Sequence, residues 1–315
     1  MKNNNFNILI TTYNRPKSIH TLLKIFSNEK WKGLLIKPNI IISDDSDNYD
    51  TEKLVKIYTS KINQFKIFYF KNNKRLGHIH NFWHILKTFE FKGYIWNYGD
   101  DDIPIINPSI LFINKIIKIK PDLALCEFRQ GDALSKGTFF KGKNRVINSL
   151  DESIKYIKCF GKSISLCFKI PNIKQLILVE KYFKGCCHDD RMIAIFSFLK
   201  SKNKKIYLQS DLTAYGDKKL NKLNYTTRAF GNMENCINRM LNLFFKNILN
   251  KKKIFFLEKN SKSEIYWYMY GLLSTLRLTS CPPYNLHFLL RELLIFPLVL
   301  LRFFLGIKIV RVKFF

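Results

Sequence analysis

Three consecutive aspartates, Asp100, Asp101 and Asp102, are the side chains of this sequence best suited to binding a metal ion. They come directly after an apolar run at residues 94–98. Adjacent carboxylates repel one another and raise one another's pKa unless a cation neutralises them. Mg²⁺ or Mn²⁺ accepts such oxygen ligands and fills the rest of its shell with phosphate oxygens. The triplet therefore predicts a divalent-metal site, and a solvated acidic turn is the alternative.

A second acidic pair, Asp44 and Asp45, follows another apolar run at residues 39–43. A carboxylate at such a position can accept hydrogen bonds from a nucleobase or a ribose. The alternative is a purely local role, because Asp and Ser side chains also cap helices and close turns. We therefore expect one of the two aspartates to take part in nucleotide binding.

Around these acids, apolar runs that predict strands alternate with amphipathic stretches that predict helices. The predicted strands are residues 6–10, 39–43, 65–70, 94–98, 123–128 and 204–209. The predicted helices are residues 16–26, 51–62, 80–89, 109–120 and 186–199. This alternation predicts an α/β fold with a mainly parallel sheet. Ligands bind beyond the carboxyl ends of the strands in such a sheet, and both acidic clusters fall at that edge.

Four segments in order resemble the nucleotide-sugar-binding half of glycosyltransferase family 2, and the agreement in order and spacing extends over residues 6–112. The segments are Ile10–Pro16, Ile42–Ser46, Asn73–Asn81 and Tyr94–Asp102. The resemblance implies the GT-A fold, a Rossmann-like, mostly parallel sheet flanked by helices. It also implies Mn²⁺ or Mg²⁺ as cofactor and a nucleotide-sugar donor, with a UDP-sugar expected first.

The resemblance also assigns site residues. The metal would be bound by Asp100 and Asp102, or by Asp101 in a shifted register. The general base would be Asp190, with Asp189 as second choice, at the start of a helix. The base would take a proton from an acceptor hydroxyl in a single inverting displacement. The donor would be bound by Thr11, Tyr13, Arg15, Asp44, Asp45, Arg75, Asn81, Asp100 and Asp101.

Basic residues outnumber acidic ones by 53 to 24, which gives a formal net charge of +29. Such a surplus predicts an anionic partner, unless it only reflects a compositional bias toward lysine. The apolar stretch 292–301 is bracketed by Arg291 and Arg302 and is too short to span a bilayer. It predicts a segment lying at an anionic membrane surface, with a buried helix as the alternative.

We expect two domains, a GT-A glycosyltransferase domain at residues 1–222 and a helical, membrane-associated extension at 223–315. Residues 1–5 lead straight into the first strand and the seven cysteines form no C-x-x-C pair, so we expect no secretory leader and a cytoplasmic location. The protein would be peripheral on the inner face of the plasma membrane. The acceptor would be a glycan or a lipid-linked glycan of bacterial surface polysaccharide or lipopolysaccharide biosynthesis.

The sequence offers three alternative functions. In the segment from His78 to His84, His80 and His84 stand four residues apart, which suits zinc. A zinc protease would need a glutamate after the first of this pair, where the chain has Asn81, and no clear third ligand follows. A nucleic-acid-binding protein would need its aromatics exposed among the lysines, whereas many lie in apolar strands, so no nucleic-acid partner is expected. A nucleotidyltransferase on a similar fold would need a glycine-rich phosphate loop, and residues 11–16 contain no glycine.

Overall fold

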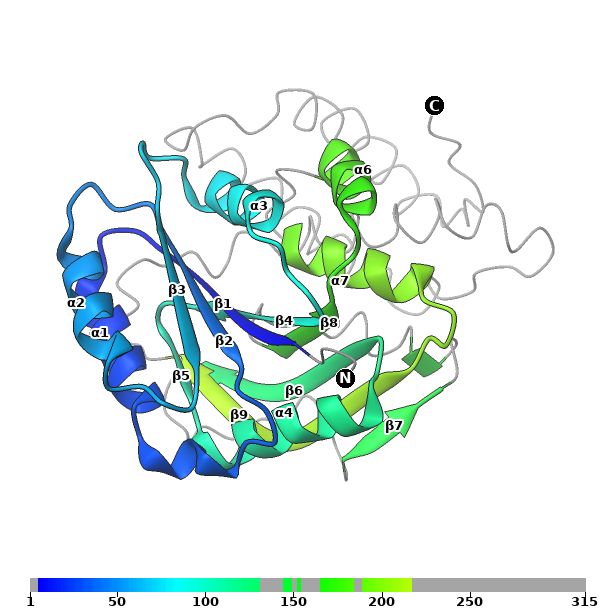
Figure 1. The fold of residues 1–315 in the computed structure, drawn as a ribbon. Helices are drawn as coiled ribbons and strands as arrows, with labels where there is room; N and C mark the ends of the chain where they lie inside the picture. Colours follow the sequence, from blue (N-terminus) through cyan, green and yellow to red (C-terminus); the bar gives the residue numbers. More distant parts are fainter. Residues whose placement is uncertain (1–4, 131–143, 149–151, 154–164, 184–188, 217–315) are drawn as a thin grey trace, which may run out of the picture. The chain divides into compact units, whose positions relative to one another are not determined.

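The computed structural model describes residues 5–130, 144–148, 152–153, 165–183 and 189–216 (Figure 1). The strands are β1 (Phe6–Thr12), β2 (Asn39–Asp44), β3 (Lys66–Lys71), β4 (Tyr94–Gly99), β5 (Asp102–Pro104), β6 (Leu123–Gln130), β7 (Arg145–Ile147), β8 (Leu166–Lys169) and β9 (Ile206–Gly216). The helices are α1 (Pro16–Phe26), the 3-10 helix η1 (Glu29–Gly33), α2 (Asp50–Thr59), α3 (His78–Thr88), α4 (Ile106–Ile119), α6 (Ile173–Phe183) and α7 (Asp189–Lys200).

The described strands form one mixed sheet in the order β3-β2-β1-β4-β8-β6-β9-β5, with β7 paired to β9. Four pairings are parallel, namely β1–β2, β2–β3, β1–β4 and β6–β9. Four are antiparallel, namely β4–β8, β6–β8, β5–β9 and β7–β9. The α/β class is confirmed, but the prediction of a mostly parallel sheet is wrong beyond β4, because the short strand β8 enters antiparallel and separates two parallel groups.

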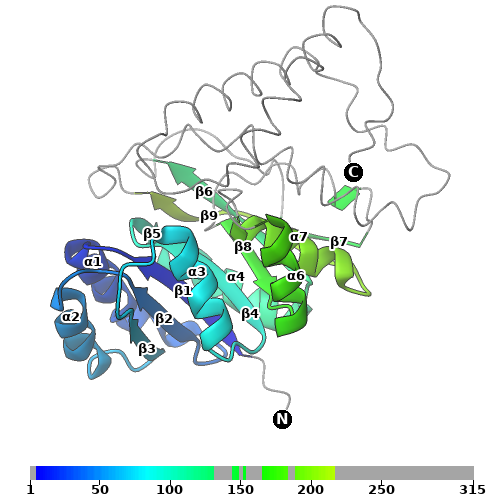
Figure 2. The same ribbon diagram turned by 90° about the horizontal axis from the view of Figure 1, so that it is seen from above.

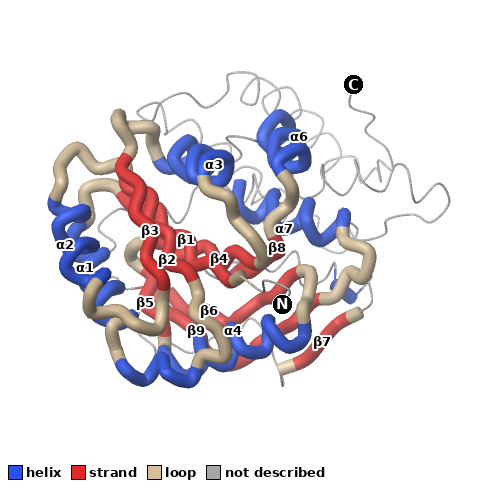
Figure 3. The backbone as a smooth tube through the Cα atoms, viewed as in Figure 1, coloured by secondary structure: helices blue, strands red, loops and turns tan. Residues whose placement is uncertain are grey.

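Helices cover both faces of the sheet, so its central strands are buried on both sides (Figures 1 and 2). In the views of Figures 1 and 3, α3, α6 and α7 lie above the strands and α4 lies below them. All seven residues of β1 are buried. Strands that are covered on both faces read as continuous apolar runs rather than alternating ones, which is why these runs could be identified from sequence.

Helix α1 shows how the apolar pattern produces this packing. It begins with Pro16, whose fixed φ suits a first helical position. Ile19, Leu22, Leu23 and Phe26 recur at helical spacing and are all buried. They join one core with alternate residues of the strands, including Ile8, Ile40 and Trp96. Full burial of each aliphatic or aromatic side chain contributes roughly 1.5–3 kcal/mol, so this face fixes the helix on the sheet.

The register of the parallel strands brings the predicted site segments to one edge. Thr12 at the end of β1 pairs with Asp44 at the end of β2, and Thr11 pairs with Gly99 at the end of β4. On the next strand, Lys71 of β3 pairs with Asp44. The four carboxyl ends therefore finish level with one another, as the sequence predicts for residues 94–98 and 39–43.

None of the helices in the described ranges is long and apolar enough to cross a bilayer. The predicted helical extension and membrane segment at 223–315 lie outside the described residues, so they and the domain boundary stay predictions.

Candidate active site

Thr12 connects the two acidic clusters. Its backbone carbonyl accepts a hydrogen bond of 2.9 Å from the backbone N–H of Asp45. Its side-chain hydroxyl donates a hydrogen bond of 2.8 Å to Oδ2 of Asp100. The acids that follow β2 and β4 are 55 positions apart between Asp45 and Asp100, yet both contact this one residue of β1. The expected convergence at one sheet edge is therefore present.

The carboxylate of Asp100 is buried and held from two sides. Besides Thr12, the guanidinium of Arg15 donates a hydrogen bond from Nη1 to Asp100 Oδ1 at 2.7 Å. Burial nevertheless raises the pKa of Asp100 above its ordinary value, with the nearby Asp101 adding to the rise, although Arg15 and Thr12 act in the opposite direction. Burial thus disfavours the ionised form of Asp100, and a second positive charge nearby would stabilise that form.

Gly99 allows the other two aspartates to fold back over the strand end. Its backbone N–H donates a hydrogen bond of 3.0 Å to Oδ2 of Asp102. A Cβ atom at position 99 would lie 2.7 Å from Asp102 Oδ2 and 2.9 Å from Asp101 Oδ1. The close approach of both carboxylates to the backbone therefore requires glycine at this position.

The triplet fits a hard divalent cation in its chemistry, because it supplies carboxylate oxygens from adjacent residues. Asp100 and Asp102 are buried, and Asp101 is partly exposed with its Oδ2 at 3.8 Å from Arg15 Nη1. Over the residues that the structure describes, no group of three or more His, Cys, Asp or Glu side chains is arranged as a ready metal site. His78, His80 and His84, the histidines of the alternative zinc site, lie exposed on α3.

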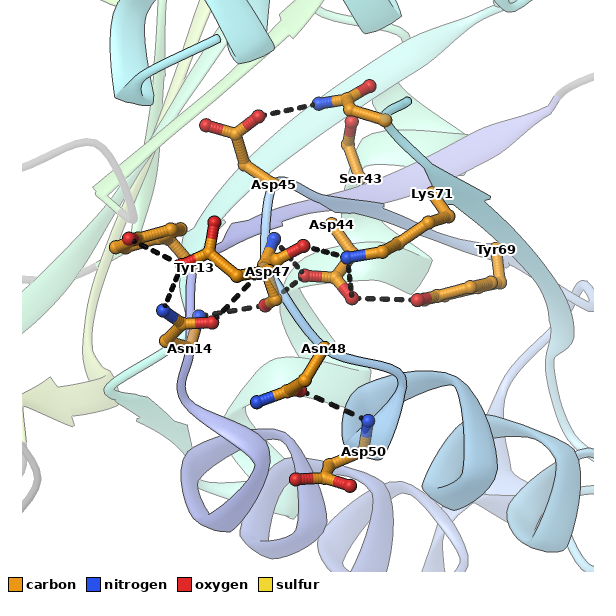
Figure 4. Close-up of polar contacts among 12 residues, drawn as sticks. Tyr13, Asn14, Ser43, Asp44, Asp45, Asp47, Asn48, Asp50, Tyr69 and Lys71 are labelled. Carbon is orange, nitrogen blue, oxygen red and sulfur yellow. Dashed lines mark hydrogen bonds and ion pairs between the residues drawn. The ribbon is translucent and has the colours of Figure 1, made fainter. Parts of the chain in front are cut away.

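Asp44 is fully buried and closes the turn after β2 (Figure 4). Its Oδ1 accepts hydrogen bonds from the backbone N–H of Ser46 at 2.9 Å and from the Ser46 hydroxyl. Its Oδ2 accepts from the Tyr69 hydroxyl at 2.7 Å, with Lys71 Nζ at 4.0 Å. Burial, and then this hydrogen bond, raise the pKa of Tyr69. The structure thus places Asp44, predicted to bind the donor, inside a network of protein contacts.

Asp45 holds the loop that follows β3. Its Oδ1 accepts from the backbone N–H of Leu76 at 2.7 Å and its Oδ2 from that of Gly77 at 2.6 Å. The side-chain amide of Asn72 donates a third bond, at 3.1 Å. Gly77 has a φ of +83°, a conformation that glycine adopts at little cost. Asp45 therefore fixes the position of residues 72–77, and through them that of Arg75.

Asn81 is buried and ties α3 to β2. Its Oδ1 accepts from the Ser43 hydroxyl at 2.6 Å and from the Asn72 side-chain amide at 2.9 Å, and its Nδ2 donates to the Ser43 carbonyl at 3.1 Å. Thr11, which is also buried and predicted to bind the donor, lies on β1 beside Gly99. Asn81 thus connects α3 to the end of β2 and to Asn72 in the loop that follows β3.

Tyr13 and Arg75 stack at the outer rim of the edge. The Arg75 guanidinium carbon lies 4.2 Å from the centre of the Tyr13 ring, a cation–π distance. Asp47 accepts hydrogen bonds of 2.8 Å from the Tyr13 hydroxyl and from the Asn14 side-chain amide (Figure 4). The hydrogen bonds from Asn14 and Tyr13 lower the pKa of Asp47, while the bond to Asp47 raises the pKa of Tyr13. Asp47 was missed from sequence, because it reads as part of an acidic turn.

The acid predicted as base lies at the start of α7. Asp190 is buried, and its Oδ2 accepts a hydrogen bond of 3.2 Å from the side-chain amide of Asn97 on β4. Asp189 begins α7, but its side chain lies outside the described part. Asn97 was also missed from sequence. Its signal was an amide within an otherwise apolar strand, two residues before Gly99.

The model of the family described as "Glycosyl transferase family 2" matches residues 7–165, half of the chain. No curated protein matches the chain.

Among solved structures, S. aureus TarS 1–349 with UDP-GlcNAc is similar at 16% identity and a TM-score of 0.51, covering 89% of this chain and 74% of that one. TarS 1–349 without a stated ligand gives 14% identity and a TM-score of 0.51 over 96% and 92%. Another TarS structure gives 17% identity and a TM-score of 0.50, and there the match covers 87% of this chain and 43% of that one. At these identities the likeness shows the fold.

Proposed function

This chain belongs to glycosyl transferase family 2, and we propose that it transfers a sugar from a nucleoside-diphosphate sugar to a hydroxyl group of an acceptor. The observation that carries the proposal is the double contact of Thr12, which joins the acids that follow β2 to those that follow β4. One sheet edge thereby gathers carboxylates, an arginine and a tyrosine ring, at the place where α/β sheets bind nucleotides.

A UDP-sugar is the donor we propose, and the TarS structures of the same fold that hold UDP-GlcNAc or UDP support it. Tyr13 and Arg75 offer an aromatic face and a guanidinium at the rim, suited to the base and the phosphates. Asp45 acts by holding the Arg75 loop, through the backbone N–H groups of Leu76 and Gly77. Asp100 faces the ribose or the diphosphate.

Asp100, Asp101 and Asp102 would hold Mg²⁺ or Mn²⁺, which stabilises the departing diphosphate when it is bound. Of the chain's own groups, Arg15 stands next to this triplet and is suited to contact a phosphate oxygen. Gly99 leaves the space in which the carboxylates of Asp101 and Asp102 lie.

Asp190 is the proposed base of a single inverting displacement. Its carboxylate takes the proton of the acceptor hydroxyl, while the acceptor oxygen forms a bond to the anomeric carbon and the bond from that carbon to the diphosphate breaks. The hydrogen bond from Asn97 orients the carboxylate from the strand that ends in the triplet. Strand β4 thus positions both the proposed base, through Asn97, and the aspartate triplet that follows the strand.

The acceptor that we propose is a glycan or a lipid-linked glycan of bacterial surface polysaccharide or lipopolysaccharide synthesis, reached from the cytoplasmic face of the plasma membrane. The net charge of +29 and the apolar and basic residues after Asn285 support a peripheral contact with anionic lipid. Removal of residues 286–315 should move the protein from the membrane fraction to the soluble fraction. An unchanged distribution would refute the membrane contact and leave the chemistry untouched.

The chemistry is tested by incubating the protein with a panel of nucleotide-sugars and Mn²⁺, Mg²⁺ or a chelator. Release of the nucleoside diphosphate is measured with and without glycan acceptors. We expect release from a UDP-sugar that depends on the divalent ion and increases with the correct acceptor. Equal release in the presence of chelator would refute the metal dependence, and no release from any donor would refute the proposed reaction.

A further inference from the structure

Arg15 contacts the carboxylates that are proposed to hold the metal. Its Nη1 is 2.7 Å from Asp100 Oδ1 and 3.8 Å from Asp101 Oδ2. The side chain of Asp100 is 9% exposed and that of Arg15 is 25% exposed, so water screens the pair only in part. The other Asp100 oxygen is fixed by the Thr12 hydroxyl. A positive charge is therefore already in place at the proposed cation site.

A divalent ion cannot approach the same two carboxylates without meeting this charge. A guanidinium and a metal ion repel each other over a few ångströms, and the repulsion is larger where solvent is partly excluded. Unless Arg15 changes rotamer, its presence lowers the affinity of Asp100 and Asp101 for the ion. Arg15 directly precedes α1, and its carbonyl accepts a bond of 3.2 Å from the Ile19 N–H, so its backbone is anchored at the start of the helix.

A diphosphate supplies a better partner for the guanidinium than one carboxylate. Arginine binds phosphate oxygens in a bidentate, charge-assisted manner, and the donor would carry two phosphates to this edge. Once Arg15 turns to the diphosphate, Asp100 loses its counter-charge and becomes a stronger metal ligand. Coupling of this kind is reciprocal, since each ligand then raises the affinity for the other by the same factor.

We propose that Arg15 is a resident counter-cation of the aspartate triplet, which disfavours the divalent ion until the donor diphosphate draws it away, so that metal and donor bind cooperatively. This inference rests on the proposed function and adds to it an order of binding. Arg15 is in this view a positioning residue, because it controls when the carboxylates are open to the metal.

The test measures Mn²⁺ affinity by electron paramagnetic resonance of free Mn²⁺, with and without UDP, at fixed ionic strength, and a protein-free titration corrects for the Mn²⁺ that UDP itself binds. The variant is Arg15→Gln, which keeps hydrogen-bonding ability and removes the charge. The matched control is Lys17→Gln, which removes the same charge from an exposed residue of α1. Circular dichroism confirms that each variant is folded before titration.

For the wild-type protein we expect weak Mn²⁺ binding that UDP strengthens by about tenfold or more. For Arg15→Gln we expect Mn²⁺ alone to bind several-fold more tightly and UDP to strengthen it much less, whereas Lys17→Gln should behave as wild type. Equal or weaker Mn²⁺ binding by Arg15→Gln without UDP would overturn the inference and leave the proposed reaction standing. A wild-type protein that binds neither Mn²⁺ nor UDP would instead refute the proposed function as well.

Discussion

The side-chain amide of Asn97 donates a hydrogen bond of 3.2 Å to the carboxylate of Asp190. The two residues are 93 positions apart in the sequence, one on β4 and the other in the first turn of α7. Asn97 lies three residues before Asp100. A single strand therefore positions the proposed base as well as the proposed metal and donor ligands. Transfer between two bound substrates requires that the base and the donor ligands be held in a fixed geometry.

Replacement of the proposed base should separate binding from turnover. Asp190→Asn keeps the shape of the side chain but cannot accept a proton, so kcat should fall by about 100- to 10,000-fold. The affinity for UDP with Mn²⁺, measured by calorimetry, should stay within about threefold of wild type. Asp50→Asn is the control, because Asp50 is also in the first turn of a helix, α2, and is exposed. Wild-type turnover in Asp190→Asn would refute the assignment.

A methyl group at position 99 should disturb the triplet without unfolding the protein. In Gly99→Ala the new Cβ would lie 2.7 Å from Asp102 Oδ2 and 2.9 Å from Asp101 Oδ1, so both carboxylates must move. We expect the affinity for UDP with Mn²⁺ to fall by about 10- to 100-fold. Gly33→Ala is the matched control, since its Cβ would lie at 3.4 Å from Ile110 and at ordinary contact distances beyond. Equal affinities for the two variants would show that a methyl group at position 99 does not displace the carboxylates of Asp101 and Asp102.

The loop at 72–77 should depend on the charge and geometry of Asp45. In Asp45→Asn one acceptor oxygen becomes an NH₂ group, which cannot accept from the N–H of Leu76 or Gly77. Loss of one such buried bond should lower the free energy of unfolding by about 1–3 kcal/mol. Urea denaturation measures it, and hydrogen exchange at the amides of 76 and 77 should accelerate. Asp47→Asn, at an exposed carboxylate of the same rim, should cost less. The reverse ranking would argue against Asp45 as the anchor of the loop.

The buried carboxyl of Asp100 should make stability fall as pH rises. Its pKa is raised by burial, so the folded protein keeps this proton to a higher pH than the unfolded chain does. Ionisation then lowers the free energy of unfolding across the interval between the two pKa values, and the loss is complete above the folded-state pKa. Asp100→Asn should therefore melt at a higher temperature than wild type at pH 7 in chelator. The advantage should vanish below the ordinary pKa of an aspartate, 3.8. A variant that melts lower at pH 7 would show that the Arg15 pair outweighs burial.

Much of the N-terminal half of the fold could be predicted because its strands are covered on both faces. Residues 6–10, 39–43 and 94–98 are short apolar runs, and each proved to lie within a strand, while the helix predicted at 16–26 has the observed bounds of α1. The strands that were missed, β5, β7 and β8, have only three or four residues. Such segments show no period, and their antiparallel pairing depends on partners far along the chain.

The candidate site could likewise be predicted only in part. Sequence order places Asp45 and Asp100 at strand ends, and the structure brings both to Thr12. The sequence does not reveal which carboxylates accept hydrogen bonds from the protein itself. Asp44 and Asp45 do so, and their donors, the Tyr69 hydroxyl and the backbone of a distant loop, are brought to them only by the fold. Asn97 could not be predicted for a related reason, because its role depends on the hydrogen bond to Asp190 of α7, which the sequence of the strand alone does not show.

The proposed function requires that the cation and the nucleotide bind at the carboxyl ends of β1, β2 and β4. Paramagnetic broadening by Mn²⁺ in the presence of UDP tests it most directly, with backbone amide signals of the labelled protein as the readout. We expect the amides of Thr12, Asp45 and Gly99–Asp102 to broaden, while those of Asn39, Lys66 and Tyr94, at the opposite ends of the strands, stay sharp. Broadening at the opposite ends, or none that depends on UDP, would contradict the account.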